Sequence, residues 1–142
     1  MTDLETADTA IFDRIPAPDP CLAQVVAMIN GSQKGEIGVT LNVQGSVVSG
    51  LLISGERFFL GLQEAIRSSS GADARFAEIW QPAVDAYRAD READEGLDEA
   101  MNKTVFIHLR DTKVINGSTA NVGFWRGRLE SVDGWSLARL DV

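Results

Sequence analysis

His108 is the residue best placed to do acid–base chemistry, because it is the only histidine among the 142 residues. Imidazole titrates near neutral pH, so a general base or a catalytic triad in this chain would have to use it. His108 lies beside Arg110 in an alternating stretch typical of a β-strand, and no G-x-S-x-G turn or comparable nucleophile motif accompanies it. The pattern favours a histidine on a strand surface, with a general base as the alternative.

Three other features resemble binding sites but lack the required spacing. The carboxylates between Glu92 and Glu99 do not follow the D-x-[DN]-x-[DN]-G order of a calcium loop. The glycines at 31 and 35 do not fit G-x-x-x-x-G-K-[ST] and precede a strand instead of a helix. Cys21 is the only cysteine, which excludes an internal disulfide and a cysteine-based metal site. We therefore predict no catalytic, cofactor-binding or metal-binding residues.

Aromatic and basic residues are the better candidates for function, through contact with another protein. Phe58 and Phe59 are adjacent, as are Phe124 and Trp125, and adjacent side chains cannot all face one side of a strand or a narrow helix stripe. At least one of each pair is expected to reach a second surface, although most such aromatics fill a core. The predicted contact residues are Phe58, Phe59, Trp125, Arg126 and Arg128.

Charge is distributed unevenly along the chain. The net charge is −8, with −6 in residues 56–100 and +2 in residues 101–142. An acidic chain repels a phosphate backbone, so nucleic acid is disfavoured as a partner. A basic region beside an acidic one favours association with copies of the same chain or with a charged protein surface. A solvated surface with scattered charges is the alternative.

Two strands joined by a tight turn are the clearest structural signal. Apolar residues alternate with polar ones over 39–43, Gln44-Gly45-Ser46 supplies the turn, and the apolar run resumes over 47–53. Gly50 inside this run predicts a bulge or bend. Further strands are predicted at 103–115, 122–129 and 134–140, with a turn-rich connection at 116–121.

Helices are predicted before the hairpin and after it. Asp19-Pro20 starts the first helix, which ends at Asn30-Gly31. An acidic helical insertion occupies about 55–100: one helix follows Ser54, and a second, over 72–93, is kinked or split by Pro82. Residues 88–99 are predicted to form a frayed end and a mobile acidic linker, and residues 1–18 a flexible tail.

These elements predict one α+β domain over residues 19–142. Its core is a small, five-stranded, strongly bent antiparallel sheet or barrel of Sm-like or SH3-like type, with an N-terminal helix and the helical insertion after the second strand. By analogy of architecture alone, a binding module for RNA or another protein is a second possible function. The acidic, proline-bearing start and the lack of a long apolar run predict a cytosolic protein without membrane spans.

Two blocks of the chain resemble the gas vesicle accessory protein GvpU family. They are the hairpin at 40–54 and the region containing Val105-Phe-Ile-His-Leu-Arg110 and Phe124-Trp-Arg-Gly-Arg-Leu129. The resemblance implies a non-enzymatic cytosolic protein that associates with gas vesicle shell proteins, with shell assembly or clustering as candidate roles. The family supplies no catalytic residues. We hypothesise that self-association, with several weak contacts per copy, links the shells.

Overall fold

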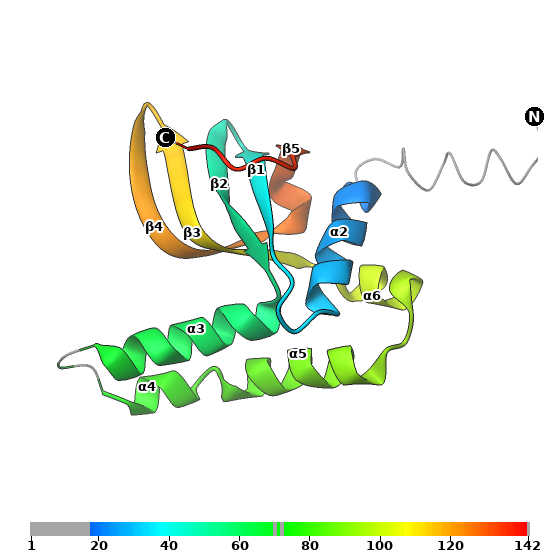
Figure 1. Ribbon diagram of the computed structural model, residues 1–142, viewed down its shortest axis with the longest axis vertical. Helices are drawn as coiled ribbons and strands as arrows, with labels where there is room; N and C mark the ends of the chain where they lie inside the picture. The colour runs from blue at the N-terminus through cyan, green and yellow to red at the C-terminus, as the bar shows by residue number, and fades with distance from the viewer. Residues whose placement is uncertain (1–17, 70, 72, 142) are drawn as a thin grey trace, which may run out of the picture.

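Five strands form one antiparallel sheet with the spatial order β4-β3-β2-β1-β5. The computed structural model describes residues 18–69, 71 and 73–141, so most of the predicted tail lies outside it (Figure 1). The elements are α2 (Pro20–Asn30), β1 (Ile37–Val43), β2 (Ser46–Ile53), α3 (Gly55–Ser68), α4 (Arg75–Glu78), α5 (Gln81–Ala93), α6 (Leu97–Lys103), β3 (Phe106–Asn116), β4 (Ser118–Arg128), the 3-10 turn η1 (Leu129–Ser131) and β5 (Val132–Ser136).

The β1–β2 hairpin is confirmed, and its turn consists of two residues. Gln44 and Gly45 both have positive φ, 52° and 89°, which suits the twist of a two-residue hairpin turn. The irregularity predicted at Gly50 is also confirmed, since the β2–β3 register shifts there. A Cβ on Gly50 would lie 2.9 Å from the carbonyl oxygen of Arg110, so glycine permits this close approach.

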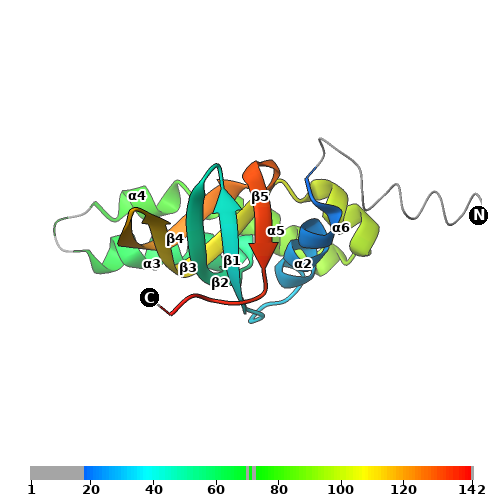
Figure 2. The ribbon, with the colours of Figure 1, turned by 90° about the horizontal axis from the view of Figure 1, so that it is seen from above.

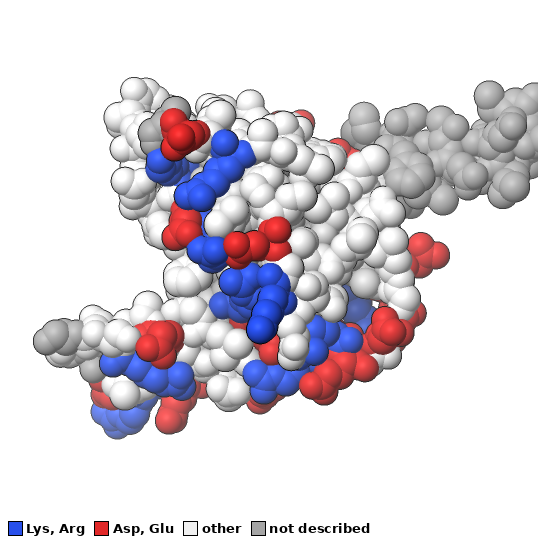
Figure 3. Space-filling model, viewed as in Figure 1, with Lys and Arg blue, Asp and Glu red and all other residues white. Residues whose placement is uncertain are grey.

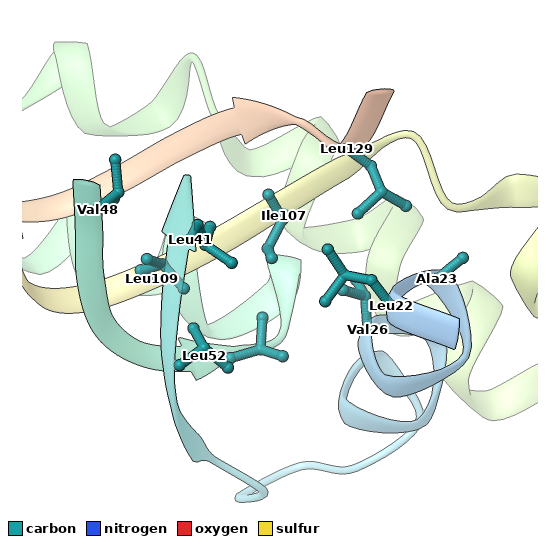
Figure 4. Close-up of a cluster of buried hydrophobic side chains, with 10 residues drawn as sticks. Leu22, Ala23, Val26, Leu41, Val48, Leu52, Ile107, Leu109 and Leu129 are labelled. Carbon is teal, nitrogen blue, oxygen red and sulfur yellow. The ribbon is translucent and has the colours of Figure 1, made fainter. Parts of the chain in front are cut away.

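The sheet is packed on two sides by two hydrophobic clusters. The larger lies between the sheet and α2, where Leu22 and Val26 meet Leu41, Leu52 and other strand residues (Figure 4). The smaller lies beside α3 and α5, which run antiparallel along one side of the sheet (Figure 1). Its buried members are Ile53, Phe58, Phe59 and Val84.

The strongly bent or barrel-like sheet predicted from the sequence was wrong. β4 and β5 lie at opposite edges and do not pair, so the sheet is open. Closing a sheet is one way to bury apolar residues on its inner face, whereas here helices cover it instead. The analogy that suggested RNA binding was based on the barrel and does not hold.

Other differences from the expected elements are local. The predicted turn-rich connection at 116–121 is mostly strand, because β4 begins at Ser118 directly after a tight turn at Gly117. The predicted frayed end and acidic linker at 88–99 is largely helical, because α5 continues to Ala93 and α6 begins at Leu97. Pro82 does split the predicted long helix, since it occupies the first turn of α5 after α4 has ended. Within the described residues, no helix combines the length and apolar character that a bilayer span requires.

Candidate functional site

His108 is fully buried on the side of β3 that faces α3. Its ring packs against Phe58, Phe59 and Tyr87, with ring centroids 4.8–5.9 Å apart. The Nε2 atom accepts a hydrogen bond from Nε of Arg126 at 3.1 Å. The prediction of a surface histidine was wrong, because α3 covers this face of the strand.

This environment fixes the protonation state of His108. Burial, and then the positive charge of Arg126, lower its pKa from 6.5 to about 3. Because Nε2 is an acceptor, the proton of the neutral ring sits on Nδ1, which finds no hydrogen-bond partner in the part of the chain that the structure describes. A neutral imidazole with no exposed surface serves as an internal acceptor for Arg126, and it does not meet solvent.

Phe58 and Phe59 are both buried, with 5% and 7% of their surfaces exposed. They belong to the smaller cluster, where their rings meet edge to face at 5.1 Å. Adjacent helix positions both find a core here because α3 lies between the sheet and α5. Neither ring is therefore available to a partner, although we had expected one of them to be.

The other predicted contact residues lie on β4 and are partly or well exposed. Trp125 is half-buried and packs against the larger cluster. Arg126 is exposed, but its guanidinium lies over the ring of Phe106 at 3.5 Å and reaches His108. Arg128 pairs with Glu130 at 3.1 Å, and 62% of its side chain is exposed. Of the five predicted residues, Arg128 offers the most accessible charge.

A band of basic residues, which the sequence pattern did not single out, crosses the sheet away from Arg126 and Arg128. Arg110 donates three hydrogen bonds to Glu36, and Arg57 reaches the same carboxylate at 3.2 Å. Hydrogen bonds from Arg110 and Arg57 hold the pKa of Glu36 below its ordinary value. We call this band the basic stripe (Figure 3). It comprises Lys34, Arg57, Arg110, Lys113 and Arg139, with Glu36 and Asp111 between them.

Acidic residues gather instead on α5, α6 and the turn between them (Figure 3). Lys103 lies among them and pairs with Glu95 at 2.6 Å and with Asp90 at 3.7 Å. Arg91 does not pair with these carboxylates but with Glu56, which also forms an ion pair with Arg88. We call the exposed carboxylates the acidic end. They are Asp90, Glu92, Asp94, Glu95, Asp98 and Glu99.

The acidic end borders a groove of about 280 Å³ between α2, α5 and α6. Its lining is mixed: Met28 and Leu97 are apolar, while Asp90, Glu95 and Lys103 are charged. No group of three or more histidine, cysteine, aspartate or glutamate side chains suited to a metal ion occurs within the described residues. The acidic end is an exposed cluster of negative charge on α5, α6 and the turn between them.

Comparison with models of known protein families identifies one match. The model of a family described as "Gas vesicle protein GvpU-like" matches residues 19–140, which include every helix and strand described above. The chain belongs to this GvpU-like family. The match confirms the resemblance seen in the sequence and extends it over the first helix and the helical insertion. No curated protein and no solved structure matched the chain.

Proposed function

We propose that this GvpU-like protein is a non-enzymatic, cytosolic accessory protein that associates with gas vesicle shells and clusters them, or promotes their assembly, by self-association. Family membership supports the connection with gas vesicles. The observation that carries the self-association is the separation of charge on one molecule, with the basic stripe over the sheet and the acidic end on α5 and α6 (Figure 3).

The two surfaces are complementary in charge. The basic stripe holds five cations and two carboxylates, while the acidic end presents six carboxylates around Lys103. Opposite potentials attract over roughly a Debye length, about 10 Å at 0.1 M salt. The basic stripe of one copy is therefore suited to the acidic end of the next.

A contact between two different surfaces is open-ended. Each copy that uses its basic stripe still has a free acidic end, so further copies can add, and an open chain grows wherever the rotation between copies does not close a ring. Copies bound to one shell are also held close to one another, which raises their effective concentration and makes weak contacts sufficient. Several weak contacts per copy can thus join neighbouring shells without any site for chemistry.

Light scattering at increasing ionic strength tests self-association. We expect large assemblies at about 0.01 M salt and their loss near 1 M, because the screening length falls from roughly 30 Å to roughly 3 Å. The double substitution Lys34→Glu and Arg139→Glu should abolish the assemblies. Arg67→Glu with Arg75→Glu is the matched control, because it changes net charge equally outside both surfaces. A single monomeric species at every salt and protein concentration would refute the proposal.

Association with shells needs its own measurement. Purified gas vesicles float, so the protein should float with them on centrifugation at low salt and should not float without them. Vesicle clustering, followed by turbidity or microscopy, should then require the intact basic stripe. Protein that stays in solution in the presence of vesicles would contradict shell association while leaving self-association standing.

A further inference from the structure

β4 is a long strand at an open edge of the sheet. It runs for 11 residues, about twice the usual strand length, and pairs only with β3 among the described elements. The opposite edge strand, β5, has 5 residues and lies beside α2 (Figure 2). Trp135 of β5 donates a hydrogen bond to Asp19 at the start of α2, at 2.7 Å. The open edge of this sheet is therefore that of β4.

The first part of β4 lacks charges and prolines, two of the features that usually protect an edge. Natural edge strands carry charges, prolines or bulges that discourage another strand from pairing. Residues 116–125 contain no charged residue and no proline, and residues 118–123 are all exposed. One register shift occurs at Val122, a residue that is itself apolar and 44% exposed. The stretch before it, 118–121, is regularly paired to β3 and free along its other edge.

The same stretch is complementary to itself when two copies run antiparallel. A two-fold axis through Ala120 places Ala120 opposite its own copy and Thr119 opposite Asn121, so that opposed side chains lie on the same face of the joined sheet. All these residues are small or uncharged, and their backbone groups are free to form a ladder. Parallel pairing in register would set Arg126 against its own copy, and like charges directly opposite are unfavourable.

We propose that two copies of this protein pair through β4, antiparallel about this axis, and so join their sheets into one. A second copy fits this edge because the uncharged stretch of one copy then lies against the same uncharged stretch of the other. Arg126 and Arg128 lie outside the paired region. A two-fold contact of this kind is closed and gives a dimer. The biological role of this dimer rests on the proposed self-association. Dimers whose basic stripes and acidic ends stay free can associate further and form branched networks.

High salt distinguishes the β4 contact from the contact between the basic stripe and the acidic end. The β4 contact consists of backbone hydrogen bonds and neutral side chains, so it should persist at about 1 M salt, where charged surfaces are screened. Sedimentation velocity of the full chain at this salt should show a dimer. Ala120→Lys should raise the dimer dissociation constant about tenfold or more. Ser136→Lys, on the other edge strand, is the matched control and should leave it unchanged.

An intermolecular disulfide tests the same contact independently, in case the Ala120→Lys variant does not fold. In a Cys21→Ser background, Ala120→Cys should form an intermolecular disulfide faster than Ser136→Cys, because Cα atoms across this axis come within disulfide range. A wild-type monomer at high salt, or equal disulfide rates at both positions, would overturn the β4 contact. Assembly at low salt without a dimer at high salt would refute this inference alone. A high-salt dimer without low-salt assembly or vesicle binding would refute the proposed function alone.

Discussion

The burial of His108 predicts a pH dependence of stability that one residue controls. Its pKa is about 3 in the folded protein and 6.5 for the ordinary imidazole, so the unfolded chain binds a proton first as pH falls. The free energy of unfolding is therefore complete above pH 6.5 and decreases as pH falls below it. Between pH 8 and pH 5.5 the loss should be about 1.4 kcal/mol, a tenfold change in the unfolding equilibrium.

Urea unfolding, followed by the fluorescence of the three tryptophans, measures this loss. His108 is the only histidine, and the carboxyl groups of Glu36 and Glu56 have pKa values below 4.5, so they titrate below this window. His108→Gln and His108→Leu should be less stable at pH 8 but should show no loss between pH 8 and pH 5.5. If the wild type shows no loss either, or if the variants lose as much as the wild type, His108 is not held neutral by burial.

Two further substitutions test the packing around α3. Gly61→Ala should lower the free energy of unfolding by about 1–3 kcal/mol in urea titrations, because its Cβ would lie 2.3 Å from the ring of Phe124, whereas Gly134→Ala, with open space around it, should change little. An equal effect of both would contradict the close contact. Glu56→Gln should cost about 1–3 kcal/mol at pH 7, because two arginines of α5 lose a largely buried partner. Burial raises the pKa of Glu56, but the hydrogen bonds from Arg91 and Arg88 lower it overall, so the wild type's advantage should decrease as pH falls below 4.5. An advantage that is as large at pH 3 as at pH 7 would count against this ion pair.

Local signals in the sequence were sufficient for much of the fold. The turn at Gln44 and Gly45, the helix start at Asp19 and the break at Pro82 each depend on a residue's own backbone preference or a bond to a near neighbour. Such preferences act within a few residues, so they can be recognised without knowing the tertiary structure. They placed the hairpin, the first helix and the division of the insertion.

Tertiary packing decided the features that were missed. The barrel and the surface position of His108 left one side of the sheet to solvent, and the expected exposure of Phe58 or Phe59 assumed that the helix buries only one narrow stripe. α3 covers that side, and an amphipathic pattern does not say which surface a helix will meet. α6 was missed because it has only 7 residues, so its apolar positions, Leu97, Ala100 and Met101, are too few to stand out among the surrounding acidic residues.

The sequence predicted which parts of the chain are acidic or basic, but not where in the fold these charges come together. Summing charges along the chain separated an acidic insertion from a basic final segment. The basic stripe, however, joins Lys34, Arg57, Arg110 and Arg139, which are far apart in the sequence and meet only through the sheet. Of the predicted contact residues, Arg126 and Arg128 are exposed near the end of β4, the strand at the open edge of the sheet.

The most direct test of the central claim uses two charge-reversed variants and purified gas vesicles. The first carries Lys34→Glu and Arg139→Glu, and the second carries Glu92→Lys, Asp98→Lys and Glu99→Lys. At low salt neither should cluster vesicles alone, because each presents like charges on both surfaces, while an equal mixture should restore clustering. If either variant clusters vesicles as the wild type does, or if the mixture remains inactive while both variants are folded, the oppositely charged surfaces do not hold the copies together.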